Sequence, residues 1–254
     1  WSKSGSPNAP DRAQAILERA EKEYRETGDE QLKPDTVCYG SLLSAWASSR
    51  RKEGGERATA LLEKIKNIDE SCLSTVLFTN AIVAHWRSRK RDAGEKAEEL
   101  LHAMKRRTLA GDLKCKPDTI AYTSVIQAFA TSSDPRKPRK AWALLKEMCA
   151  GYLEGDLDIK PNVITFTAVL NACAFVRGSE QDRKDSVRIA LMVLKEFNDN
   201  GYDQPSSIMY RTLFNVFARQ VSDQQERAKF IAATFQRCCE AGQVDNSIIE
   251  FLQE

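Results

Sequence analysis

The sequence predicts an all-α fold, a solenoid of stacked antiparallel helix pairs, and three observations predict it. The same eight-residue pattern occurs five times, and the aromatic residues that open its copies lie 39, 44, 44 and 44 positions apart. Apolar residues follow each opening aromatic after three, four and seven positions, which is the period of an amphipathic helix. A second stripe of the same period follows each copy. Recurrence at this interval is typical of solenoids, in which each unit buries its apolar face against its neighbours.

The first helix of each unit carries the opening aromatic, and we expect these helices to begin at residues 36, 75, 119, 163 and 207. The opening aromatics are Tyr39, Phe78, Tyr122, Phe166 and Tyr210. A small residue stands six positions after the first four of them, where it lets a neighbouring helix approach closely. These small residues are Ala45, Ala84, Ala128 and Ala172.

The second helix of each unit carries a stripe of the type Ala-x-x-Leu-Leu-x-x-Met. It is expected at residues 58–65, 97–104, 141–148, 190–197 and 228–235, with one more copy at 13–20. Turn-rich segments such as 48–55 and 131–138 separate the two helices.

Most units close with a proline that stops the second helix and a polar residue that suits the start of the next. Examples are Lys33-Pro34-Asp35 and Lys160-Pro161-Asn162. The predicted organisation is one repeat array over residues 1–254. It consists of a partial repeat at 1–35, repeats at 36–74, 75–118, 119–162, 163–206 and 207–246, and a remnant at 247–254.

The N-terminal segment fits the same frame. Trp1 lies twelve positions before Ala13, as Trp46 lies twelve before Ala58. We therefore expect Trp1 to end a first helix whose beginning is missing, so that the chain starts inside a repeat.

The composition limits the classes of function. Lys and Arg total 38 against 36 Asp and Glu, a net charge of +2, which argues against a strongly basic, nonspecific nucleic-acid binder. Seven cysteines without a C-x-x-C pair indicate a reducing compartment, with neither a disulfide framework nor a zinc site. No apolar run approaches 18 residues, so no membrane span is expected, and no targeting peptide is visible.

Three repeated motifs together resemble the pentatricopeptide repeat family. Its unit has a Val-x-Tyr-Asn opening, an Ala-x-x-Leu-Leu-x-x-Met second helix and a Lys-Pro-Asp close. The openings here are Thr36-Val-Cys-Tyr39, Thr75-Val-Leu-Phe78, Thr119-Ile-Ala-Tyr122, Val163-Ile-Thr-Phe166 and Ser207-Ile-Met-Tyr210. The units are longer than the family's, and Gly40 and Arg211 stand where the opening Asn would fall. The tetratricopeptide opening Trp-x-x-Leu-Gly-x-x-Tyr is absent, and HEAT-like units lack the proline close.

The resemblance implies a right-handed superhelix, with the first helices lining its concave face, that binds single-stranded RNA at one base per repeat. The residue two positions before each aromatic would clamp the base between apolar surfaces. These clamp residues are Val37, Val76, Ile120, Ile164 and Ile208. The alternative is that they begin the buried apolar stripe.

The resemblance also implies which residues read the base edge. They pair as Gly40 with Ser74, Thr79 with Asp118, Thr123 with Asn162, Thr167 with Ser206, and Arg211 with Asn246. In the family, Thr with Asp implies guanine and Thr with Asn implies adenine. A Thr hydroxyl donates or accepts, whereas an ionised Asp only accepts, so such pairs can discriminate bases. The alternative role of each Asp, Asn or Ser is helix capping, and Arg211 would equally suit a phosphate.

Basic residues recur in the turns between the two helices, at 50–52, 87–91 and 136–140. They would either form a basic stripe along one edge of the solenoid or simply lie in solvated loops. No motif for a catalytic site, a metal or a cofactor stands out, and His85 falls on an apolar stripe. We therefore expect a binding protein with no enzymatic activity, cofactor or small-molecule substrate. The resemblance implies a mitochondrial or plastid location. The other interpretation is a protein-binding scaffold, such as a subunit of an organellar ribonucleoprotein.

Overall fold

The protein is all-helical in a computed structural model that describes residues 8–253. This part of the chain contains twelve α-helices and four short 3-10 helices and no β-strand. The α-helices are α1 (Ala9–Thr27), α2 (Thr36–Ser49), α3 (Gly54–Ile68), α4 (Thr75–Ser88), α5 (Ala93–Leu109), α6 (Thr119–Thr131), α7 (Lys137–Leu153), α8 (Val163–Ala174), α9 (Glu180–Asn200), α10 (Ser207–Gln220), α11 (Gln224–Glu240) and α12 (Asn246–Gln253). The 3-10 helices are η1 (Glu30–Leu32), η2 (Glu70–Cys72), η3 (Leu113–Cys115) and η4 (Leu157–Ile159).

The prediction of equivalent opening helices is confirmed. The five opening aromatics are each the fourth residue of their helix, in α2, α4, α6, α8 and α10. All five are buried, with at most 7% of the residue exposed. Trp1, expected to end a first helix, lies outside the described residues.

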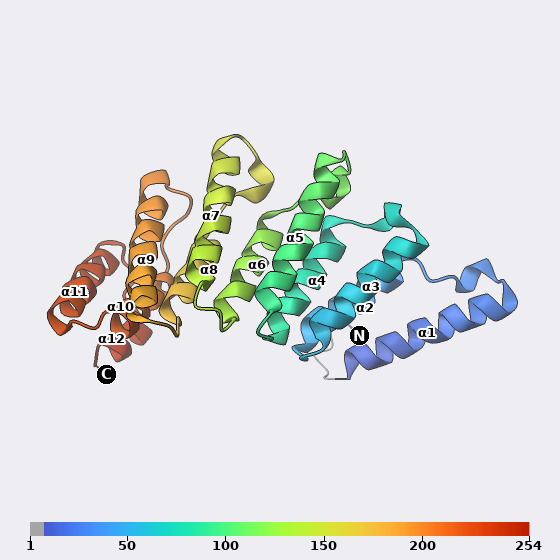
Figure 1. The fold of residues 1–254 in the computed structure, drawn as a ribbon, viewed down its shortest axis with the longest axis horizontal. Helices are drawn as coiled ribbons and strands as arrows, with labels where there is room; N and C mark the ends of the chain where they lie inside the picture. Colours follow the sequence, from blue (N-terminus) through green and yellow to red (C-terminus); the bar gives the residue numbers. More distant parts are fainter. Residues whose placement is uncertain (1–7, 254) are drawn as a thin grey trace. The chain divides into compact units, whose positions relative to one another are not determined.

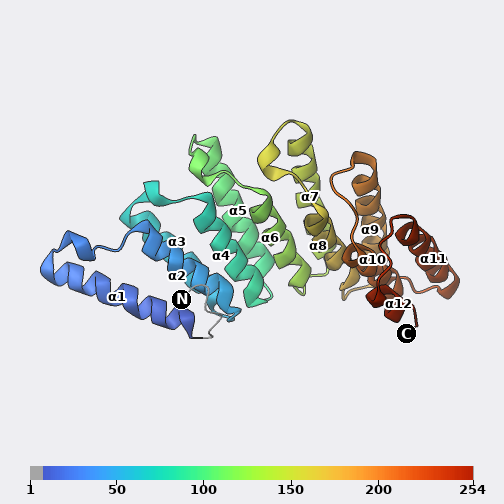
Figure 2. The ribbon, with the colours of Figure 1, turned by 180° about the vertical axis from the view of Figure 1, so that it is seen from behind.

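The chain divides into two compact units, with the boundary between Ala128 and Phe129 inside α6. In the first unit α2 contacts α1, α3 and α4, and α4 contacts α3 and α5. The helices therefore form hairpins, α2 with α3 and α4 with α5, that follow one another in chain order in both views (Figures 1 and 2). The completely buried Leu43 and Ile82 lie in the first helix of each hairpin.

Two glycines at the start of α3 allow the hairpins to pack closely. A Cβ on Gly54 would lie 3.3 Å from the carbonyl oxygen of Trp46. A Cβ on Gly55 would lie 2.8 Å from Cγ and 2.9 Å from Cε1 of His85, a residue of α4. Glycine at position 55 is thus required by the close approach of α3 to α4.

The second unit is built around α8, which contacts α7, α9 and α10. Nine of the twelve residues of α8 are buried, so this helix is apolar on nearly every side. The ring of Phe166 lies 5.0 Å from that of Phe197 and 5.4 Å from that of Tyr202. The same unit contains α10, which contacts α9, α11 and α12.

The stripe predicted at 228–235 is helical, but its burial is not as expected. In α11 the buried residues are Thr234 and Cys238, whereas Ala228 and Ala232 are exposed and Ile231 and Phe235 are half-buried. The main contact of α11 among the described elements is with α10, and part of the stripe lies in solvent.

Two long exit loops share the sequence Leu-x-Gly-Asp-Leu and hold both leucines in solvent. Leu109 ends α5 and Leu113 follows it, as Leu153 ends α7 and Leu157 follows it; each of the four is at least 64% exposed. The central glycine has φ of 97° in the first loop and 106° in the second, which glycine tolerates without a Cβ clash.

Candidate functional site

The five clamp residues all lie in solvent. Each is the second residue of its helix, and each is 58–72% exposed. The residues are Val37, Val76 and Ile120 in the first unit and Ile164 and Ile208 in the second. Burial in the apolar stripe, the alternative explanation for these β-branched residues, is contradicted by this exposure. A repeated exposed apolar side chain is available to contact a ligand.

The closing residues cap the next helix, as their alternative role predicts. Asp118 Oδ1 accepts a hydrogen bond from the backbone nitrogen of Ala121 at 2.7 Å. Asn162 Oδ1 accepts from the backbone nitrogens of Ile164 and Thr165, both at 3.0 Å. Ser206 Oγ accepts from the backbone nitrogen of Met209 at 3.3 Å. Ser74 occupies the same position before α4, but its side chain makes no capping hydrogen bond.

The last closing residue is displaced by one position from the prediction. Asp245, not Asn246, precedes α12, and its Oδ1 accepts from the backbone nitrogen of Ile248 at 3.1 Å. Asn246 is the first helical residue and is exposed. Asp245 is therefore the structural counterpart of Asp118 and Asn162. The sequence contains a signal for this frame, since Ile249 and Leu252 then take the positions of the opening aromatic and the apolar residue three further on.

The three reading threonines lie at the edge of the buried region. Thr79, Thr123 and Thr167 are 7–8% exposed. Thr167 Oγ1 donates to the carbonyl oxygen of Val163 at 2.6 Å. Thr79 Oγ1 is buried and has no hydrogen-bond partner within residues 8–253.

Gly40 and Arg211 differ from the threonines. A Cβ on Gly40 would lie 3.4 Å from Leu77 Cδ2, so this part of α2 packs against the first turn of α4. Leu77 is three residues after Ser74, which brings the predicted pair of Gly40 and Ser74 to neighbouring turns. Arg211 is exposed on α10, which contacts α12.

Further hydrogen bonds join the start of a first helix to the loop that closes its repeat. In the first unit, Thr75 Oγ1 donates a shared hydrogen bond to the carbonyl oxygens of Lys114, at 3.1 Å, and Lys116, at 2.5 Å. This shared bond places the first turn of α4, near Thr79, beside the loop that leads to Asp118. In the second unit, Val163 N donates to Asp203 Oδ2 at 3.0 Å, which relates the start of α8 in the same way to the loop before Ser206. Thr123 and Asn162 belong to different units.

Most cations of the predicted basic turn at residues 136–140 form contacts within the protein. Arg136 pairs with Asp134 at 3.0 Å, and Arg139 pairs with Asp185. Lys137 is buried, and its Nζ donates to the carbonyl oxygens of Ala130 and Ser132 at 3.1 and 3.0 Å. Burial lowers the pKa of Lys137. These cations stabilise the turn itself.

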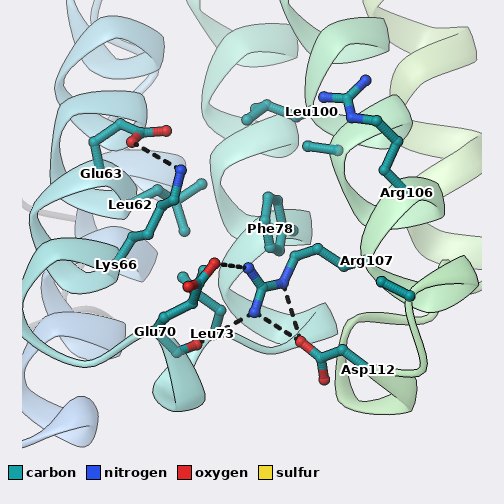
Figure 3. A pocket seen from close by; sticks show the side chains of 12 residues that line it. Leu62, Glu63, Lys66, Glu70, Leu73, Phe78, Leu100, Arg106, Arg107 and Asp112 are labelled. Carbon is teal, nitrogen blue, oxygen red and sulfur yellow. Dashed lines mark hydrogen bonds and ion pairs between the residues drawn. The ribbon is translucent and has the colours of Figure 1, made fainter.

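A cleft of about 440 Å³ lies between α3 and α5 in the first unit (Figure 3). Its floor is apolar, with Leu62, Phe78 and Leu100, and Lys66 and Arg107 stand at its rim. Arg107 is held by ion pairs with Glu70 and with Asp112, the latter at 2.8 Å. A second cleft of about 450 Å³ is lined by Tyr39, Ile65 and Ile68 among others, between the start of α2 and the end of α3.

The described residues contain no cluster of metal-ligating side chains. No group of three or more His, Cys, Asp and Glu side chains within residues 8–253 is placed to hold a metal ion. His85 is buried, its Nε2 lies 2.8 Å from Thr59 Oγ1, and burial lowers its pKa. All seven cysteines are free, and no helix of the described chain has the length and apolarity to cross a bilayer.

Comparison with known proteins adds no relative: no protein-family model matches the chain, and no curated protein matches it. The family resemblance therefore depends on the repeated residues alone.

Proposed function

We propose that this chain is a pentatricopeptide-type solenoid that binds single-stranded RNA sequence-selectively through its repeats. One observation carries the proposal. An exposed β-branched residue stands at the second position of five helices, with a polar residue two positions before it and, in the central units, a threonine three positions after it. Exposed apolar side chains next to polar groups are what an RNA-binding surface needs to stack and identify an unpaired base.

The proposal includes the right-handed superhelix that the resemblance implies. Such an array would place the clamp residues along one continuous path. The corresponding biological role is RNA processing, stability or translation in a mitochondrion or plastid. Binding, rather than catalysis, is the proposed activity.

The most specific test replaces a proposed base-reading residue while preserving its role as a helix N-cap. Asp118→Asn keeps an N-cap of equal quality for α6, because Asn and Asp cap helices about equally well. With Thr79 it forms the Thr–Asn pair, so the base selected from a randomised RNA pool should change from guanine to adenine at one position. The matched reverse exchange, Asn162→Asp, should change adenine to guanine at the next position.

Wild-type protein and both variants are compared by sequencing the RNA retained from one pool. An unchanged base preference in both variants, with RNA binding intact, would show that these side chains do not read the base. Loss of thermal stability would be a sign of damaged capping and is measured in parallel.

A protein-binding scaffold is the second candidate, and two observations favour it. A cleft with an apolar floor lies between α3 and α5, and leucines such as Leu109 and Leu157 are exposed at the exit loops. Leu109→Ala and Leu157→Ala would weaken a protein complex isolated from an organellar extract under this function. Neither change should alter RNA binding under the first.

A further inference from the structure

The two turns that join α2 to α3 and α4 to α5 lie side by side. Arg87 Nη1, at the end of α4, donates to the carbonyl oxygen of Ala47 in α2 at 3.1 Å. Lys90 Nζ, in the second turn, donates to Glu56 Oε1, in the first turn of α3, at 2.5 Å. The ends of successive hairpins therefore form one edge of the first unit.

The cations of this edge fall into two groups. Arg51, Arg87 and Lys90 hold the turns in place, and Arg51 pairs with both Asp11 and Glu53. Four other cations are exposed, and their side chains make no hydrogen bond or ion pair with residues 8–253. We call these four the basic edge: Arg50, Lys52, Arg89 and Arg91.

The backbone at this edge repeats as well. Arg50 and Arg89 are the helix C-caps of α2 and α4, with φ of 54° and 52°. They are the non-glycine residues of positive φ in the described chain, whereas the left-handed caps of the second helices α1 and α9 are Gly28 and Gly201. A non-glycine residue in this conformation costs about 1 kcal/mol. Arginine stands at both positions although glycine would adopt this conformation without that cost.

Few carboxylates oppose these charges. Glu53 and Glu56 are already paired with Arg51 and Lys90. Asp92 is the remaining exposed carboxylate of the two turns. The edge therefore keeps an excess of positive charge although the whole chain is nearly neutral.

We propose that the basic edge binds the phosphodiester backbone of single-stranded RNA. This inference rests on the proposed function and adds to it, because it assigns backbone contacts to the hairpin turns and leaves base contacts to the first helices. Guanidinium groups bind phosphate oxygens through paired hydrogen bonds. Equivalent cations on successive repeats match a polymer that carries one charge per nucleotide.

The test measures how RNA affinity depends on salt. A variant of the whole chain carries Arg50→Gln, Lys52→Gln, Arg89→Gln and Arg91→Gln, and its probe is a randomised 20-nucleotide RNA pool. Loss of four phosphate contacts should make the slope of log K against log salt shallower by about 3, since each contact to a single strand contributes about 0.7. At 0.1 M salt this corresponds to a loss of affinity on the order of 10²-fold. Base preference should not change.

A control variant removes the same number of exposed cations from second helices of the repeats. It carries Arg106→Gln, Arg188→Gln, Lys195→Gln and Lys229→Gln. Its salt slope should change by less than about 1, because these side chains are outside the basic edge. Thermal midpoints confirm that both variants fold.

Equal salt slopes in the two variants would overturn the assignment of the basic edge. If the salt slopes were equal but Asp118→Asn still changed the base preference, base recognition would be supported and phosphate binding by the basic edge would be rejected. The reverse pattern, a shallower slope with no effect of Asp118→Asn, would support the edge and reject base reading. Wild-type protein that binds no RNA would reject both. Competition by poly-L-glutamate as effective as that by RNA would reassign the edge to an acidic protein and overturn the proposal.

Discussion

Replacing Gly55 by alanine tests the close packing between α3 and α4. The new Cβ would lie 2.8 Å from Cγ and 2.9 Å from Cε1 of His85 and closer still to Nδ1. His85 is 4% exposed, so its ring has no solvent to move into. Relief of the clash would also break the 2.8 Å hydrogen bond between His85 Nε2 and Thr59 Oγ1.

The expected cost follows from these two effects. Overpacking of a filled site costs about 1–3 kcal/mol, and loss of the hydrogen bond adds about 1 kcal/mol. Alanine returns roughly 0.5–1 kcal/mol through its lower backbone entropy. The free energy of unfolding should therefore fall by about 1–3 kcal/mol, which for a chain of this size lowers the thermal midpoint by about 2–4 °C per kcal/mol.

Urea denaturation followed by circular dichroism measures the change. Gly40→Ala is the matched control, because its Cβ would lie at an ordinary 3.4 Å from Leu77 Cδ2, and its stability should be unchanged or slightly higher. His85→Ala in the background of Gly55→Ala should abolish the cost of the Gly55 substitution. A cost that is equal with and without the His85 ring would refute the packing explanation, as would a Gly55→Ala variant as stable as wild type.

Three further predictions follow from the same contacts. Burial lowers the pKa of His85 in the folded protein, so its stabilising contribution is fully present above the unfolded pKa of about 6.5 and is lost as the pH falls from there through the lower folded pKa. Urea midpoints should therefore decrease as the pH is lowered from 8 to 5, and His85→Gln should flatten this decrease. Thr79→Val removes a buried hydroxyl without a hydrogen-bond partner, so the free energy of unfolding should stay equal or rise by up to about 1 kcal/mol. Thr167→Val loses a hydrogen bond and should lower it by about 1 kcal/mol. Denaturant titrations in which the Thr79 variant is the less stable of the two would contradict this. Val76→Ala should weaken RNA binding severalfold in a filter-binding assay at unchanged stability, and Ile68→Ala, also at an exposed site, should not; equal effects would exclude a specific clamp.

The repeat frame was predictable because it depends on contacts that are local in the sequence. Helical periodicity identified which residues face inward, and Tyr39 and Phe166 are buried as the stripe requires. The exposure of Val37 was not predictable from periodicity, because a residue in the first turn of a helix is buried only if a neighbouring element covers it. The superhelix that would align the repeats stays a prediction.

The roles of the charged turns could not be read from the sequence. Arg51 is neutralised by Asp11, forty residues earlier, and Arg139 by Asp185, forty-six residues later. Arg50, next to Arg51, has no such partner among the described residues. Packing between segments distant in the sequence therefore decides which cation forms an internal ion pair and which stays exposed. The one-residue displacement at Asp245 has another cause, since Asp and Asn both suit a cap and only the apolar residues that follow distinguish them.

The burial of α8 has a consequence for synthesis of the chain. α7 emerges from the ribosome before α8, but α9 and α10, which cover its other sides, are translated later. Until α9 and α10 have both left the exit tunnel, the nascent chain exposes part of the α8 surface that they later cover, and such exposed apolar surface is prone to aggregate. Slow translation across residues 175–217 would lengthen that vulnerable interval and increase the need for a chaperone.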